Sequence, residues 1–156
     1  MTLRLAFLAL CTGLLAACTT PPPSQTTPAG FANYDDAKAL RAVNAARVVY
    51  QVRQIDNKPR ADLAFWRVAM KEHLLKSGYV LVAEGELADT ARPGYYIETS
   101  APRGSVDYNY LVAIFVQDQH ITVVESAGEL AAYKSQREHI FATLKASAAN
   151  PAGPTR

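Results

Sequence analysis

Two stretches of the chain carry apolar residues at the period of an amphipathic α-helix. The first covers residues 62–77, where apolar positions form one stripe and the basic residues lie away from it. This stripe is made of Leu63, Trp66, Met70 and Leu74. Gly78 follows at a position that favours a left-handed C-cap, so the helix is expected to end just before it.

The second helix is predicted over residues 129–147. Its expected buried side is made of Leu130, Tyr133, Ile140, Phe141 and Leu144. Its expected solvent-facing side is made of Lys134, Arg137, Glu138 and Lys145. Because each predicted helix has one apolar side, each is expected to pack against another element.

Outside the helices, β-branched and aromatic residues predict five strands. Strands are expected over residues 47–55, 79–83, 94–100, 108–116 and 120–125. Apolar residues occupy both alternating sets of positions in residues 108–116, which is typical of a strand covered on both sides. The two-residue link Asp118-Gln119 predicts that this strand forms an antiparallel hairpin with the next one.

Residues 39–43 fit two structures. They could form a strand that folds back at Asn44, or they could end a short alanine-rich helix capped by Asp35 or Asp36. The strand is the favoured interpretation. Residues 84–93 are polar and are expected to form a loop.

The order strand, helix, several antiparallel strands and helix predicts an α+β fold. An antiparallel β-sheet flanked by helices on both faces, an α/β/α sandwich, would bury the apolar side of each helix. We expect one α+β domain over residues 34–147, followed by a disordered tail over residues 148–156.

The chain begins with an apolar run from Leu3 to Ala17 that contains one early positive charge, Arg4. This is the layout of a secretory signal peptide. A bilayer span needs about 20 apolar residues, and this run is shorter and is followed by threonines and prolines, so a transmembrane anchor is disfavoured. A plain signal peptide with a chance cysteine at Cys18 is the other alternative.

The end of this run, Leu15-Ala16-Ala17-Cys18, resembles the lipobox of bacterial lipoproteins. The resemblance implies cleavage of residues 1–17, a diacylglycerol on the thiol of Cys18 and an acylated amino terminus. Residues 18–33, rich in proline and threonine, are expected to be a tether. In bacteria with two membranes, an aspartate after the lipidated cysteine commonly retains lipoproteins in the inner membrane. Thr19 is not an aspartate, which for such a bacterium favours the outer membrane, facing the periplasm.

Composition limits the function further. With 49% hydrophobic and 19% charged residues the chain can build a packed core. The net charge is +2, and removal of Arg4 with the signal peptide lowers it by one, so no nucleic-acid partner is expected. Of the two cysteines, Cys11 leaves with the signal peptide and Cys18 carries lipid, which leaves no disulfide.

The domain resembles the Mog1/PsbP-like fold, known from small bacterial lipoproteins and from extrinsic photosystem II proteins. The likeness covers residues 47–147. It rests on Lys76-Ser77-Gly78-Tyr79, on the hairpin YLVAIFVQDQHITVVESAG, and on the final helix introduced by Ala131-Ala132-Tyr133-Lys134. The resemblance implies a binding or assembly module, usually without catalysis, and carries over no functional residue.

No constellation of residues predicts an enzyme. The three histidines, His73, His120 and His139, lack the spacing of metal ligands, and no metal or other cofactor is expected. There is no GxSxG motif. The acidic residues Glu84, Glu86 and Asp89 are expected to be solvated in the polar loop. Trp66 could be a ligand-stacking platform, but a core position is favoured.

Four tyrosines on neighbouring strands, Tyr95, Tyr96, Tyr108 and Tyr110, are the candidate interface residues. Alternation along a strand predicts that Tyr95 points opposite to Tyr96 and that Tyr108 shares a side with Tyr110. Cross-strand aromatic packing is the alternative, and the favoured one.

The sequence therefore predicts a membrane-anchored envelope lipoprotein that acts as a non-catalytic binding or assembly module. Its expected partners are the membrane, through the lipid, and another envelope protein. The alternative is a small-ligand-binding or hydrolytic domain with a site near the loop of residues 84–93.

Overall fold

The structure is a computed structural model that describes residues 27–34, 39–87 and 92–149. Within these residues seven strands and two helices follow one another. They are β1 (Phe31–Tyr34), β2 (Ala39–Asn44), β3 (Val49–Asp56), α1 (Leu63–Lys76), β4 (Val80–Leu87), β5 (Gly94–Arg103), β6 (Val106–Val116), β7 (His120–Glu129) and α2 (Leu130–Ala149). The expected signal peptide, Cys18, Asp35, Asp36 and Asp89 lie outside the described residues.

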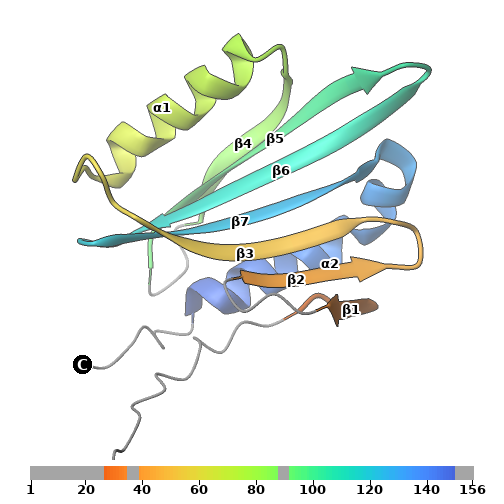
Figure 1. Cartoon of the computed structure of the whole chain (residues 1–156), viewed down its shortest axis with the longest axis horizontal. Helices are drawn as coiled ribbons and strands as arrows, with labels where there is room; N and C mark the ends of the chain where they lie inside the picture. Colours follow the sequence, from red (N-terminus) through yellow and green to blue (C-terminus); the bar gives the residue numbers. More distant parts are fainter. Residues whose placement is uncertain (1–26, 35–38, 88–91, 150–156) are drawn as a thin grey trace, which may run out of the picture.

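All seven strands belong to one sheet in the order β1-β2-β3-β7-β6-β5-β4, and Figure 1 shows its twist. Every neighbouring pair is antiparallel. The expectation of an α+β protein built on an antiparallel sheet is confirmed at this level. The two edge strands are β1 and β4.

Strand β6 contributes alternate residues to two separate apolar clusters. Leu111, Ala113 and Phe115 pack in one cluster with three buried hydrophobic residues of α2, which are Tyr133, Ile140 and Leu144. Val112 and Ile114 pack in the other with Leu74 of α1. We call the corresponding sides of the sheet the α2 side and the α1 side, because successive strand residues point to opposite faces.

Helix α1 forms where the sequence predicts it. Asp62 is the N-cap, and its Oδ1 accepts a hydrogen bond of 2.8 Å from the N–H of Phe65. Gly78 has φ of +87°, in the left-handed region that favours glycine after a helix. In the predicted apolar stripe, Leu74 is buried and the other three residues are half-buried. The helix therefore lies on the sheet without closing tightly onto it.

Residues 39–44 form strand β2, which confirms the favoured alternative for this stretch. The chain then turns back into β3. Asn44 holds the turn, because its Oδ1 accepts a hydrogen bond of 2.9 Å from the N–H of Val48. Arg47 has φ of 63° within this turn. The predicted hairpin of β6 and β7 is also confirmed, closed by a 2.8 Å bond from the N–H of Gln117 to the carbonyl oxygen of His120.

The tether was expected to continue to Asn33, and this boundary is wrong. Strand β1 begins at Phe31 and pairs with β2 along its four residues. The ring of Phe31 contacts that of Tyr50 edge-on, with 6.3 Å between centroids. Backbone pairing and this ring contact add residues 31–33 to the sheet, although they are too few to show an alternating pattern.

Other boundaries also differ from the prediction, among them the start of β3 and the ends of β5 and β6 that meet in their turn, which lie two or three residues from the expected positions. Residues 84–87 belong to β4 rather than to a polar loop, because they pair along β5, and the carboxylates of Glu84 and Glu86 form ion pairs with basic residues of α1. Strand β7 continues to Glu129, past the expected end at residue 125. Helix α2 continues to Ala149, where the tail was expected to begin at residue 148.

Candidate functional site

A cavity of about 420 Å³ lies between α1 and the strands β3, β6 and β7, and we call it the α1 cleft. Its wall on the helix is made of Trp66, Ala69, Met70, His73, Leu74 and Ser77. Its floor on the sheet is mainly apolar and is made of Ile55, Val112, Ile114, Ile121 and Val123. The polar residues of the floor are Arg53, Tyr110 and Glu125, and Tyr79 lies beside it. A mainly apolar cavity with a few polar groups is the usual form of a small-molecule site.

The α1 cleft is open because α1 covers only part of the sheet. The helix packs over β5 and β6, and two ion pairs hold its other flank to the edge strand β4. Arg67 Nη1 lies 3.0 Å from Glu86 Oε1, and Lys71 Nζ lies 2.6 Å from Glu84 Oε1. The flank that carries Trp66 lies over β7 and β3. Among the contacts of the described residues, no comparable pair of ion pairs joins this flank to those strands.

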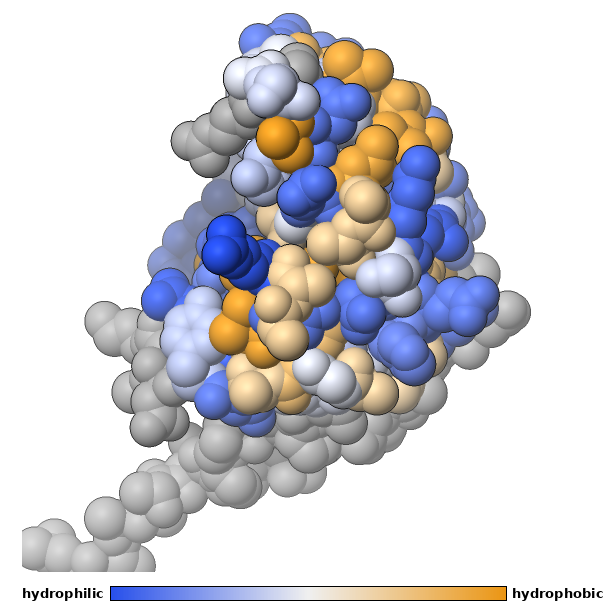
Figure 2. All heavy atoms as spheres, turned by 90° about the vertical axis from the view of Figure 1, so that its right-hand side faces the viewer, coloured by the Kyte–Doolittle hydropathy of each residue, from blue (hydrophilic) through white to orange (hydrophobic). Residues whose placement is uncertain are grey.

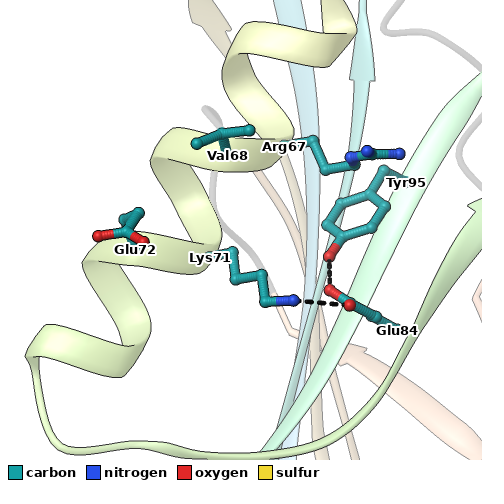
Figure 3. A pocket seen from close by; sticks show the side chains of 6 residues that line it. All are labelled: Arg67, Val68, Lys71, Glu72, Glu84 and Tyr95. Carbon is teal, nitrogen blue, oxygen red and sulfur yellow. Dashed lines mark hydrogen bonds and ion pairs between the residues drawn. The ribbon is translucent and has the colours of Figure 1, made fainter.

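The flank of α1 beside β4 has a shallow pocket of about 300 Å³. Figure 3 shows Lys71 and Tyr95 both directed at the carboxylate of Glu84, where Tyr95 donates its hydroxyl hydrogen. The hydrogen bonds from Lys71 and Tyr95 lower the pKa of Glu84. Burial and the bond to Glu84 raise the pKa of Tyr95. At neutral pH this pocket therefore holds an ionised carboxylate that is already paired.

The floor of the α1 cleft contains a three-residue polar group. Arg53 Nε donates to Glu125 Oε2 at 2.9 Å, and the Tyr110 hydroxyl donates to Glu125 Oε1 at 2.6 Å. Burial alone would raise the pKa of Glu125, but the hydrogen bonds from Arg53 and Tyr110 and the charge of Arg53 outweigh it and lower that pKa. Burial and the bond to Glu125 raise the pKa of Tyr110. The group is therefore charge-balanced.

Trp66 lies in the apolar stripe of α1 and lines the α1 cleft. Its Nε1 donates a hydrogen bond of 2.7 Å to Oδ1 of the buried Asn57. Asn57 Nδ2 in turn donates to the carbonyl oxygens of Ala61 at 2.9 Å and Gln117 at 3.0 Å. The indole is thus fixed at its polar edge while its apolar surface lines the cleft, so Trp66 has both a core contact and a place in the site.

The three histidines are not brought together. His73 lines the α1 cleft, His120 Nδ1 lies 3.8 Å from Asp56 Oδ1, and His139 is exposed on α2. Within the described part of the chain there is no group of three or more histidine, cysteine, aspartate or glutamate residues that could hold a metal ion.

The four candidate interface tyrosines do not form one patch. Tyr95 is on the α1 side and is only 3% exposed, whereas Tyr96 packs on the α2 side against Phe141, with 4.9 Å between ring centroids. Their predicted opposition is confirmed. Tyr110 is half-buried on the α1 side beside Tyr79, with 5.6 Å between the ring centroids. Tyr108 is 40% exposed and is the one exposed residue of the four, so it is the most accessible to a partner.

A buried charged group on the α2 side was missed by the sequence analysis. The Glu98 side chain is 3% exposed and accepts hydrogen bonds from Arg137, with Nη2 to Oε2 at 2.8 Å, and from the Tyr133 hydroxyl at 2.8 Å. Arg137 was expected to face solvent. Its guanidinium instead turns to Glu98 and stacks 4.2 Å from the centroid of the Phe141 ring.

Large apolar side chains are also exposed, on the outer side of α1 and along β4. Val68 is 59% exposed and Val80 is 58% exposed. The full set is Phe65, Val68, Leu75, Val80, Leu81 and Val82, and we call it the outer apolar surface. Hydrophobic residues gather near the top of Figure 2, where Figure 1 places the end of α1 and the start of β4.

Comparisons with known proteins identify the fold and no family. No family model matches the chain, and no curated protein matches it. A solved structure of a Pseudomonas aeruginosa protein of unknown function, PA94, is similar, with a TM-score of 0.58 and 10% sequence identity. The match covers 81% of this chain and 98% of that one. At this identity the likeness concerns the fold alone.

Neither of the two helices in the described residues is long and apolar enough to cross a membrane.

Proposed function

We propose that this chain is a lipid-anchored protein of the bacterial cell envelope whose domain binds another envelope protein without catalysing a reaction. In this proposal Cys18 carries the lipid and the residues before β1 form the tether. The fold would be an α/β/α sandwich of the Mog1/PsbP-like type. Strand β6 has residues in one apolar cluster with α1 and in another with α2, and this observation supports the more specific fold.

The observation that carries the proposed function is the outer apolar surface. Phe65, Val68 and Leu75 recur on α1 at spacings of three and seven, so they lie along one outer side of the helix. The opposite stripe of the same helix packs on the sheet. Helix α1 thus has apolar residues on two sides, and several large exposed apolar side chains on one side of a helix favour an interaction site.

Strand β4 carries the other exposed apolar residues, at the edge of the sheet, where Val80 is opposite Ser100 and therefore lies on the α2 side. The strand has β5 on one side, and its other side has no strand partner among the described residues. A register shift between Leu81 and Ala83 leaves Val82 unpaired with β5. Bulges limit the pairing of an edge strand with the backbone of another chain. We therefore expect a partner to contact the exposed side chains of Val80 and Val82 rather than to add a strand to β4.

The lipid anchor is tested with the wild type and the Cys18→Ala variant in a bacterial host. Intact mass and membrane fractionation are measured for both. We expect the wild type to carry the mass of a diacylglycerol and a further acyl chain and to fractionate with the outer membrane, since two or more chains give stable anchoring. The variant should appear in the soluble periplasmic fraction. If both forms are soluble and equal in mass, the anchor is refuted.

The interaction surface is tested by crosslinking in intact cells. A photoreactive phenylalanine analogue is placed at Val68 or Val80, and at the exposed Ala142 of α2 as the matched control. We expect one reproducible adduct with another envelope protein from the first two positions and none from the third. Val68→Glu should remove the adduct formed at Val80. Equal adducts from all three positions, or only a dimer of this chain, would contradict the proposal.

The alternative of a small-ligand or hydrolytic site at residues 84–93 has weaker support. Glu84 lies in β4, and its lowered pKa and its pairing with Lys71 make it a poor acid or base near neutral pH. The support for a small ligand lies in the α1 cleft instead.

A further inference from the structure

We infer that the α1 cleft binds an uncharged, mainly apolar small molecule, which lies against Trp66, Met70 and Ile121 and accepts a hydrogen bond from Arg53. This inference concerns a different surface from the outer apolar surface and does not depend on the partner proposed above. The cleft opens on the flank of α1 away from β4.

The size and walls of the cleft favour a small apolar ligand. Its volume of about 420 Å³ falls in the range of small-molecule sites, which is roughly 300–1,000 Å³. Trp66 and Met70 of the apolar stripe pack against the buried cluster of the α1 side, but they stay half-buried because part of each side chain lines the cleft. Filling it would remove the apolar surface of both side chains from water, at roughly 25 cal/mol per Å².

The electrostatics of the floor favour an uncharged ligand. Within the described lining of the cleft, Glu125 is the one carboxylate and Arg53 the one guanidinium, and they neutralise each other at 2.9 Å. The Tyr110 hydroxyl is already a donor to Glu125. A charged ligand would lose its hydration without gaining an unpaired counter-charge, which is unfavourable in a mainly apolar site.

Arg53 gives the ligand one polar contact. Its Nε donates to Glu125, and a guanidinium has four further N–H donors in a fixed fork. The arginine side chain is partly exposed at the cleft. A carbonyl or ether oxygen on an otherwise apolar molecule can therefore accept a hydrogen bond there without breaking the pair with Glu125.

The position of Trp66 is set before any ligand binds. Its Nε1 hydrogen bond to Asn57 and the bonds from Asn57 to two backbone carbonyls hold the indole at the cleft wall. Pre-organised contacts reduce the ordering cost of binding. Trp66 is also the one tryptophan of the chain, so its fluorescence reports directly on this wall.

The preference of the cleft for an uncharged apolar molecule is tested with two probes that share one apolar body. N-phenyl-1-naphthylamine is uncharged, and 8-anilino-1-naphthalenesulfonate adds an anionic sulfonate to the same rings. Each is titrated against the Cys18→Ala form of the chain, which avoids detergent. We expect one equivalent of the uncharged probe to bind, with energy transfer from Trp66, and the anionic probe to bind at least about tenfold more weakly. Absent binding, equal or tighter binding of the anionic probe, or binding without energy transfer would overturn the inference.

Two variants of one helix locate the site. Ala69→Phe places a ring in the cleft, whereas Ala64→Phe places the same ring on an exposed position of α1. We expect Ala69→Phe to weaken the binding of the uncharged probe at least about tenfold and Ala64→Phe to leave its affinity unchanged. Circular dichroism confirms that each variant is folded. If Ala69→Phe is unfolded, Ile121→Phe takes its place, and unchanged affinity in a folded cleft-filling variant contradicts the site.

Discussion

Glu98 of β5 and Arg137 of α2 form a two-point ion pair within the α2 side of the molecule. Arg137 Nε lies 3.1 and 3.2 Å from the two carboxylate oxygens, and Nη2 lies 2.8 Å from Oε2. The carboxylate is almost fully buried and the guanidinium is partly exposed. The pair therefore fixes the position of α2 on the sheet through a group that cannot be left buried alone.

Removing the arginine should destabilise the domain. In Arg137→Met the buried carboxylate of Glu98 keeps only the Tyr133 hydroxyl among the partners described above, and an uncompensated buried charge is costly. We expect a loss of about 2–3 kcal/mol in the free energy of unfolding, measured by urea titration. The matched control is Lys134→Met, an exposed position of the same helix, which should change stability by less than about 0.5 kcal/mol. Equal effects of the two variants would contradict this role.

Glu125 should make the stability of the domain depend on pH. Its pKa is lowered in the folded state, so the unfolded chain binds more protons around the usual value of 4.5 and stability increases with pH there. The contribution is present above that value and is lost as the pH falls through the lower folded pKa. We expect the wild type to lose more unfolding free energy between pH 7 and pH 3 than Glu125→Gln does. Parallel pH profiles of the two proteins would contradict the lowered pKa.

The elements predicted correctly are those whose pattern is complete in the local sequence. Helix α1 has its stripe, its N-cap Asp62 and its terminal Gly78 within one stretch. The hairpin of β6 and β7 has two long apolar runs and a short link. Each of these signals depends on neighbouring residues alone, so no knowledge of distant contacts was needed.

The features that were missed depend on contacts between distant residues. Glu84 of β4 is paired with Lys71, and the burial of Glu98 depends on Arg137, which is 39 positions further along the chain. Composition assigns such acidic residues to solvent. The α1 cleft was missed for a related reason, because the distance between α1 and the sheet is set by the side chains of four elements together. In residues 83–87 the two glutamates alternate with small or apolar residues. This alternation was the one local signal that could have predicted a strand beyond residue 83.

Gly94 is required by a close approach between β5 and β6. A Cβ added there would lie 2.5 Å from Cδ1 of Phe115 and 2.9 Å from the carbonyl oxygen of Ile114. Because the second contact is with backbone, the strands would have to separate, and we expect Gly94→Ala to cost about 2–3 kcal/mol. Gly85→Ala is the control, since its Cβ would meet only the outer end of the Tyr96 ring at 2.9 Å. Its cost in the same denaturant titration should be below about 1 kcal/mol, and a reversed order would refute the explanation.

Asn57 should control the environment of Trp66. In Asn57→Ala the indole Nε1 loses its acceptor, and the carbonyl oxygens of Ala61 and Gln117 lose their side-chain donor. We expect a loss of about 2–3 kcal/mol in unfolding free energy, because several buried polar groups lose a partner together. We also expect a changed emission maximum of Trp66 in the folded state. The matched control Trp66→Phe removes the donor while it keeps an aromatic ring at the cleft, so it should cost less. A folded Asn57→Ala protein with wild-type emission and stability would show that this bond does not hold the indole in place.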